Sequence, residues 1–284
     1  MTFLSYQPRR AGRALTLLSL TGLCATSVVP AHAGLSITTL ASFTGNGAGT
    51  NGGYPYAGVT FDSSGNLFGT TENGGTIGNG TIYEIAKGSN SLTTVASFTG
   101  SNGSTPFGGV TFDSSGNLFG TTVYGGTTGN GTVYEIAKGS SSLTTLASFT
   151  GSGAGTNGGY PYGGVTFDSD GNLFGTTTGG GTSDNGTVYE IAKGSSSITT
   201  LTSFTGAGTN GGYPAGGVTL DSSGNLFGTT LHGGTSDAGT VYEIAGAGSP
   251  VPESSTVISF ATLLGLGGLV LCARKRRQDA TPGA

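Results

Sequence analysis

The sequence predicts an all-β protein built as a β-propeller-like ring of four four-stranded repeats. Three observations carry this prediction. One segment recurs four times in the chain, each copy contains four short runs rich in β-forming residues, and no helical period occurs between them. The chain has 284 residues, including 58 glycines and 9 prolines, which by itself suggests low complexity. Only 8% of its residues are charged, however, and a disordered chain usually carries more charge.

The first element is a predicted secretory signal peptide over residues 1–33. Arg9, Arg10 and Arg13 make its start positive, residues 14–29 are apolar, and Ala31-His32-Ala33 has the A-x-A pattern of a cleavage site. We therefore expect an exported chain that begins at Gly34 after cleavage.

The second element is a predicted repeat domain over residues 34–248. The segment Gly-Val-Thr-Phe-Asp-Ser-Ser-Gly-Asn-Leu-Phe-Gly-Thr-Thr begins at Gly58 and recurs, with small changes, at Gly109, Gly164 and Gly217. Each copy continues into Gly-Thr-(Val/Ile)-Tyr-Glu-Ile-Ala, and the first three continue into a threonine-rich block that ends in phenylalanine. Four strands in about 50 residues are typical of a propeller blade.

Four strands are expected in each copy, and in the first copy they lie at residues 58–62, 66–71, 80–86 and 91–98. Val, Ile, Thr, Tyr and Phe favour strands there. The segment between the first two, Asp62-Ser63-Ser64-Gly65-Asn66, is typical of a hairpin turn, because the aspartate can accept backbone N–H groups and glycine reaches positive φ.

The fourth copy stops at Ala245, after its third strand, and a counterpart of the missing strand lies at residues 35–43. We predict that this N-terminal strand pairs with the last copy and closes the ring, which would remove two exposed sheet edges. An open β-solenoid is the alternative architecture.

The third element, residues 249–284, is predicted to be a sorting tail. It begins with a short motif, Val251, Pro252 and Glu253. Residues 256–273 are apolar and uncharged, and as a helix they would span about 27 Å, enough for a transmembrane segment. The tail then has a basic cluster, Arg274, Lys275, Arg276 and Arg277, which should remain cytoplasmic.

This order of parts resembles the PEP-CTERM sorting signal of Gram-negative bacteria, although Ser254 replaces the second proline of the family's Val-Pro-Glu-Pro motif. The resemblance implies transient insertion into the inner membrane, an exosortase-type processing enzyme as partner, and removal of the tail. Cys24 and Cys272 would then both be lost, so the mature protein would have no disulfide.

The repeat itself resembles the choice-of-anchor tandem repeats named GloVer. The pattern Gly-Asn-Leu-Phe-Gly-Thr-Thr, then Gly-Gly, then Gly-Thr-Val-Tyr carries the resemblance over about residues 35–245. The stretch Gly-Val-Thr-Phe-Asp-Ser-Ser-Gly-Asn-Leu-Phe is also similar to NHL-type propeller blades, which bears on the fold only. The GloVer resemblance implies an exported bacterial protein and no enzymatic activity.

Charge and residue inventory restrict the function. Between Gly34 and Pro250 the chain has three lysines and twelve carboxylates, which gives a net charge of −9. Such a region lacks the basic surface that binding to nucleic acid requires, so a nucleic-acid-binding function is excluded. His232 is the only histidine of this region, and no Gly-x-Ser-x-Gly motif accompanies it. Four equivalent glutamates could supply a glycosidase pair or an axial cation site, but their repetition favours a structural role: Glu84, Glu135, Glu190 and Glu243.

Two kinds of loop are candidates for binding. In every copy, two residues that differ between copies follow Gly-Thr-Thr. The polar and aromatic residues at these positions form a predicted ligand-binding patch: Glu72, Asn73, Tyr124 and His232. Ordinary drift between duplicated loops is the alternative. The aromatic and proline segments before each copy are expected to pack between repeats: Tyr54-Pro55-Tyr56, Pro106-Phe107, Tyr160-Pro161-Tyr162 and Tyr213-Pro214.

No cofactor or metal is expected. Residues 168–172, Asp-Ser-Asp-Gly-Asn, offer oxygen ligands to Ca²⁺, but a hairpin turn explains them better. We therefore predict a non-enzymatic structural or adhesive protein of the cell envelope, cell surface or extracellular matrix, with exopolysaccharide as a ligand. The alternative is a carbohydrate-active enzyme, a lyase or glycosidase, with its site on a propeller rim.

Overall fold

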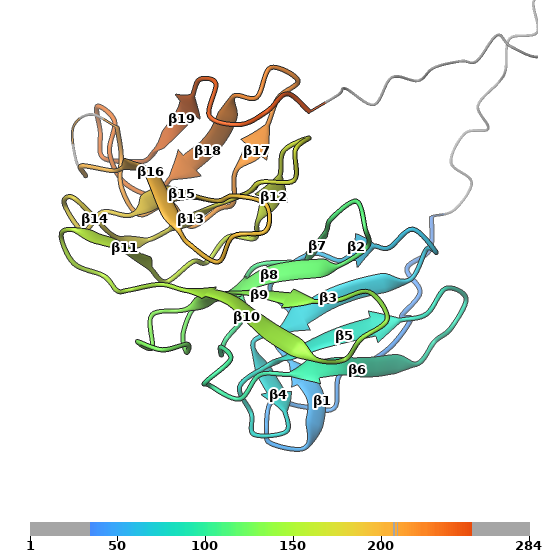
Figure 1. Ribbon diagram of the computed structural model, residues 1–284. Helices are drawn as coiled ribbons and strands as arrows, with labels where there is room; N and C mark the ends of the chain where they lie inside the picture. The colour runs from blue at the N-terminus through green and yellow to red at the C-terminus, as the bar shows by residue number, and fades with distance from the viewer. Residues whose placement is uncertain (1–34, 207, 209, 252–284) are drawn as a thin grey trace, which may run out of the picture. The chain divides into compact units, whose positions relative to one another are not determined.

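The computed structural model describes residues 35–206, 208 and 210–251 (Figure 1). The predicted signal peptide, the apolar stretch 256–273, the basic cluster 274–277 and all of the predicted sorting motif except Val251 lie outside these residues. Within them, no helix is long and apolar enough to cross a membrane. The described chain divides into two units, with the boundary between Thr39 and Leu40. Residues 35–39 of the first unit are in no strand, and the second unit contains all four repeats.

All named elements of the described chain are β-strands, which confirms the all-β prediction. The first repeat forms the sheet β2 (Thr60–Phe61), β3 (Leu67–Thr71), β5 (Thr81–Ile85) and β6 (Leu92–Ser97), in that order. The second forms β7 (Thr111–Phe112), β8 (Leu118–Thr122), β9 (Thr132–Ile136) and β10 (Leu143–Ser148). The third forms β12 (Thr166–Phe167), β13 (Leu173–Thr177), β15 (Thr187–Ile191) and β16 (Thr199–Ser203).

The sheet of the fourth repeat has three strands, β17 (Thr219–Leu220), β18 (Leu226–Thr230) and β19 (Thr240–Ile244). All pairs in the four sheets are antiparallel. Two small ribbons accompany the first and third repeats: β1 (Thr50–Gly53) with β4 (Asn73–Gly75), and β11 (Thr156–Gly159) with β14 (Gly179–Gly181).

The hairpin turn predicted between the first two strands is present in every repeat. In the first repeat, Asp62 Oδ1 accepts the backbone N–H groups of Ser64 at 2.9 Å and Asn66 at 2.8 Å, and Gly65 has a φ of 87°. The same bonds recur around Asp113, Asp168 and Asp221. The turn is therefore set by local side-chain chemistry, which explains why the sequence was sufficient to locate it.

A tyrosine and a glycine face each other in the centre of every sheet. In the third repeat Gly175 pairs with Tyr189, and a Cβ placed on Gly175 would lie 2.4 Å from the tyrosine hydroxyl oxygen. Phe149 of the preceding repeat packs edge-on against the ring of Tyr189 at 5.0 Å. The phenylalanine that ends one repeat is thus a packing partner of the next.

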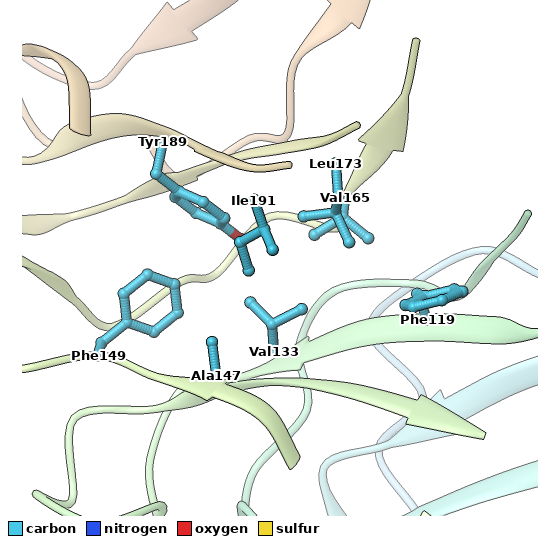
Figure 2. Packing of buried hydrophobic residues seen from close by; sticks show 8 residues of the cluster. All are labelled: Phe119, Val133, Ala147, Phe149, Val165, Leu173, Tyr189 and Ile191. Carbon is cyan, nitrogen blue, oxygen red and sulfur yellow. The ribbon is translucent and has the colours of Figure 1, made fainter. Parts of the chain in front are cut away.

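The hydrophobic core consists of three clusters, and each joins two consecutive repeats. Figure 2 shows the middle cluster, in which Val133 and Phe149 of the second repeat face Leu173, Tyr189 and Ile191 of the third. The other two join the first repeat to the second and the third to the fourth. Consecutive repeats are therefore stabilised mainly by burial of each other's apolar faces.

Paired glycines allow the repeats to approach closely. A Cβ on Gly163 would lie 2.4 Å from the backbone nitrogen of Gly217 in the next repeat. Beside this contact, the buried Thr176 donates its hydroxyl proton to the carbonyl oxygen of Gly216 at 2.7 Å. Thr70 and Thr121 make the equivalent bonds between the earlier repeats.

Ring closure by residues 35–43 is not confirmed. Residues 35–40 form no strand, and in the part of the chain that the structure describes β19 pairs only with β18. Thr229, the counterpart in the fourth repeat of the buried Thr70, Thr121 and Thr176, is exposed. Phe43, in contrast, packs on Tyr83 at 5.0 Å, as the other repeat-ending phenylalanines pack on their tyrosines.

Candidate functional site

The loops before each repeat are held in an uncommon backbone conformation. Tyr54, Thr105, Tyr160 and Tyr213 have φ between 56° and 58°, a region that residues other than glycine seldom adopt. In the fourth repeat, the Tyr213 N–H donates to the Asn185 carbonyl of the preceding repeat at 2.8 Å, and its carbonyl accepts the Leu231 N–H at 3.3 Å. Bonds to two repeats thus fix this residue, and its side chain remains exposed.

The prolines that follow pack between repeats, as the sequence analysis expected for these segments. Pro161 lies against Gly131 and Pro214 against Gly186 of the preceding repeat, at positions where a Cβ would be 2.7 Å and 2.6 Å from the proline Cδ. The position after each proline then carries an aromatic ring in the first three repeats and Ala215 in the fourth.

These rings form a column that crosses the first three repeats. The ring centroids of Tyr56 and Phe107 are 4.7 Å apart, and those of Phe107 and Tyr162 are 5.3 Å apart. Each ring therefore packs against the equivalent ring of the next repeat. The column ends at Tyr162, because Ala215 has no ring to continue it.

An open hollow of about 390 Å³ lies at the end of the column. Its lining residues come from the third and fourth repeats: Tyr162, Thr178, Tyr213, Ala215, Leu231 and His232. The hollow is next to the position where the other repeats have a ring, so the small Ala215 side chain accounts for it. Tyr162, Leu231 and Ala215 supply apolar surface, and the histidine and tyrosines supply polar atoms.

None of these lining residues is a carboxylate, lysine or arginine. His232 contacts Tyr213 edge-on, with ring centroids 5.4 Å apart, and its side chain is 54% exposed. Its Nδ1 lies 3.8 Å from Asp237 Oδ2, too far for a hydrogen bond. The imidazole can therefore turn toward a ligand and donate or accept a hydrogen bond.

The structure brings two of the four predicted binding residues to this place. His232 lines the hollow, and Tyr124 lies close enough to Tyr162 in its wall to affect the pKa of that tyrosine. Burial, then the neighbouring Tyr124, raises the pKa of Tyr162. Tyr124 also packs on Tyr160 at 5.5 Å.

The other two predicted residues lie in the first repeat. The Glu72 N–H donates to the Tyr54 carbonyl at 3.1 Å, and Asn73 is in β4, opposite Gly53. Neither lines the hollow. Sequence reasoning assigned Tyr162 and Tyr213 to packing between repeats and did not consider Ala215, although alignment of the four copies does show alanine where three copies have an aromatic residue.

Two smaller hollows lie beside the hairpin turns, of about 250 Å³ between the first and second repeats and about 310 Å³ between the second and third. Their aspartates already serve the turns. Burial raises the pKa of Asp168, but hydrogen bonds from Ser249, Asn172 and Asp170 outweigh this effect and lower it. Of the oxygens that the sequence offered to Ca²⁺, those of Asp168 accept N–H groups of the turn and the backbone N–H of Ser249, and Asp170 Oδ2 accepts the Ser249 hydroxyl. Among the described residues, no three or more His, Cys, Asp or Glu side chains are grouped so that they could hold a metal ion.

The four equivalent glutamates lie apart, one in each sheet. Glu135 pairs with Phe119 and Thr144 on its neighbouring strands, and Glu190 pairs with Phe174 and Thr199. Their cross-strand partners are thus aromatic and hydroxyl side chains.

Comparison with known proteins gives one family match. The model of the Gloeobacter/Verrucomicrobia repeat matches residues 27–156 and 152–268, which together include all four copies. No curated protein matches. Among solved structures 54 chains match, including TolB from Acinetobacter baumannii, which is 16% identical with a TM-score of 0.42. That match covers 68% of this chain and 44% of the TolB chain.

Proposed function

This chain belongs to the Gloeobacter/Verrucomicrobia repeat family, and from that premise we propose that it is an exported, non-catalytic surface or matrix protein that binds a neutral polysaccharide. The observation that carries the proposal is the hollow beside Ala215, where one sugar ring would take the place of the absent fourth ring of the aromatic column.

The chemistry of the hollow suits a sugar. A pyranose ring has apolar C–H faces and a rim of hydroxyl groups, so it needs a flat apolar wall and polar groups at the edge. Tyr162 supplies the wall, and His232 and Tyr213 supply polar atoms at the mouth. A mostly apolar concave surface with a few placed polar groups is typical of small-ligand sites.

The charges favour a neutral ligand. The lining residues include no fixed charge, and His232 has an acidic neighbour, Asp237. The surrounding repeats have a net charge of −9, which would repel an acidic polysaccharide. Tyr124 contributes to this proposal as a positioning residue for Tyr162, whereas Glu72 and Asn73 have no part in it.

Filling the hollow should abolish binding without loss of stability. We expect Ala215→Phe, which restores the ring that three repeats already have, to prevent retention of the purified full-length protein on the neutral exopolysaccharide of its host. Tyr162→Ala should weaken retention about tenfold, the effect of losing roughly 1.4 kcal/mol of ring packing. Tyr56→Ala, at the far end of the column, is the matched control and should bind normally.

Two results would contradict this site. Wild-type retention by the Ala215→Phe variant would show that the sugar lies elsewhere, and release of oligosaccharide during the incubation would show that the protein is an enzyme. Thermal unfolding of each variant separates a lost site from a lost fold.

The sorting half of the proposal rests on the two ends of the sequence. We propose that residues 1–33 direct export and that the tail from Val251 onward is recognised by an exosortase-type enzyme after its helix inserts in the inner membrane. Deletion of residues 251–284 should move the protein from the cell surface to the periplasm or medium, as measured by fractionation and immunoblotting. An unchanged surface location would refute this half alone.

A further inference from the structure

The last sheet lacks the outer strand that the other three sheets have. β5, β9 and β15 each have an outer partner, β6, β10 and β16, whereas β19 is the edge of its sheet (Figure 1). The side chain of Val241 in β19 is 80% exposed, while its counterparts Ile82, Val133 and Val188 are fully buried by the next repeat. The last repeat thus presents a face built like the buried ones.

The first repeat presents the complementary face. Val110, Val165 and Val218 are buried against the repeat that precedes each of them. Their counterpart Val59 is 52% exposed, and Phe61 beside it is exposed too. The two ends of the series therefore carry the two halves of the interface that occurs three times inside it.

The sequence of the missing strand lies just before the first repeat. Residues 36–43, Ser-Ile-Thr-Thr-Leu-Ala-Ser-Phe, match residues 91–98, Ser-Leu-Thr-Thr-Val-Ala-Ser-Phe, which contain β6. Phe43 packs on Tyr83 at 5.0 Å and 74°, and Phe98 packs on Tyr134 at 5.0 Å and 67°. The end of this segment is thus attached to the first repeat as β6 is attached to the second.

Inside the chain, an outer strand such as β6 has two partners. It pairs with the third strand of its own repeat, and the phenylalanine that follows it packs on the tyrosine of the next repeat. For residues 36–43 only the second partner is in place. The first and last repeats of one chain do not supply the other contact: a Cβ on Gly58 would meet nothing within 4 Å, and one on Gly216 would meet only Thr229 of its own repeat.

We infer that the missing partner is a second copy of this chain. Residues 36–42 of one copy add to the free edge of β19 of another, and the first repeat of the one packs on the last repeat of the other as consecutive repeats do. Addition of a strand to an exposed sheet edge is a common mode of recognition. Because the contact joins two different surfaces, it continues from copy to copy, which suits a matrix protein.

The internal sheets define the register. In the first repeat Ala96 lies opposite Ile82 and Leu92 opposite Ile85. The equivalent pairs between copies are Ala41 with Val241 and Ile37 with Ile244. Directly opposite Cβ atoms in antiparallel strands are close enough for a disulfide bond.

Cysteine pairs test this register directly. In the full-length protein with Cys24 and Cys272 replaced by serine, an Ala41→Cys variant mixed with a Val241→Cys variant should form a disulfide-linked dimer under mild oxidation. The chain that carries both substitutions should form a ladder of multimers. Glu243→Cys, on the same strand but out of register with Ala41, is the control for Val241→Cys and should not cross-link. A doubly substituted chain that yields only internally cross-linked monomer, or mixed variants that yield no dimer, would overturn the inference.

A second variant removes the contact without touching a buried residue. Val241→Asp places a charge on a side chain that is exposed in the single chain, so the melting temperature of the monomer should not change. We expect light scattering after size exclusion in mild detergent to show multimers of the wild-type protein and monomers of the variant. A monomeric wild type, or multimers of the variant like those of the wild type, would contradict the proposal.

Discussion

The free energy of unfolding should fall steeply above about pH 10, because two tyrosines are fully buried with hydroxyl groups that lack a partner. Tyr134 and Tyr189 have no exposed surface, and their hydroxyl oxygens make no hydrogen bond in the described structure. Burial raises the pKa of both far above the ordinary tyrosine value of about 10. A phenolate in either position would be a buried, unpaired charge.

The direction of the pH effect follows from proton linkage. Below about pH 10 both tyrosines are protonated in the folded and unfolded chains, so their contribution to stability is fully present. As the pH rises past this value, the unfolded chain loses these protons and the folded chain keeps them. Each tyrosine then lowers the free energy of unfolding by about 1.4 kcal/mol per pH unit until the folded pKa is reached.

Replacement of both tyrosines tests this explanation. The Tyr134→Phe/Tyr189→Phe variant should lose a large part of the alkaline slope in urea unfolding curves recorded between pH 8 and 12, and the rest should remain because burial also raises the pKa of Tyr83 and Tyr242. At neutral pH it should be as stable as the wild type or more stable by about 1–2 kcal/mol, because each substitution removes a buried hydroxyl without a partner. Tyr56→Phe, at an exposed position, is the control. A double variant with the wild-type slope would show that other groups cause the alkaline loss.

Gly163→Ala should destabilise the protein by about 1–3 kcal/mol, the usual cost of forcing a methyl group into a packed interior. A Cβ at this position would lie 2.4 Å from the Gly217 nitrogen and 2.5 Å from the Gly216 carbonyl carbon. Both atoms belong to the backbone of the next repeat, so no side-chain rotation relieves the clash. The third and fourth repeats would have to separate, which would disrupt their shared cluster around Val188 and Phe204.

The fourth repeat offers an exact control. Gly216 occupies the same position in its repeat, but a Cβ there would meet only the Thr229 hydroxyl oxygen at 3.6 Å. Gly216→Ala should therefore leave the midpoint of urea unfolding nearly unchanged, while Gly163→Ala lowers it. Equal effects at the two positions would mean that backbone preference, rather than contact between repeats, decides the cost.

Local features were predictable from the sequence. The hairpin turns at Asp62 and its counterparts are present because aspartate and glycine act on their own backbone, and strands such as β5 lie where β-forming residues predicted them. The first strand of each repeat is shorter than expected, Thr60–Phe61 in place of residues 58–62. The glycines before it approach another repeat instead of joining the ladder, as Gly109 does beside Gly58.

The candidate binding site was only partly predictable. His232 and Tyr124 stood out because they differ between copies, but Glu72 and Asn73 differ in the same way and lie in another repeat. The hollow is present because Ala215 has no aromatic ring at the position where the other three repeats have one. This can be recognised only once Tyr162 and the other rings of the column, which lie 53 or more residues away in the chain, are seen to pack together.

The sequence by itself therefore determined the number of copies, the strand type and the turns, because those depend on bonds within a few residues. The tertiary structure alone decided that Tyr56, Phe107 and Tyr162 form one column, that a hollow follows it, and that Val59 and Val241 remain uncovered at the two ends of the series. These features depend on how the apolar faces of separate repeats pack together. The sequences of the four copies are nearly identical, so they do not show which copies have a packing partner on each side.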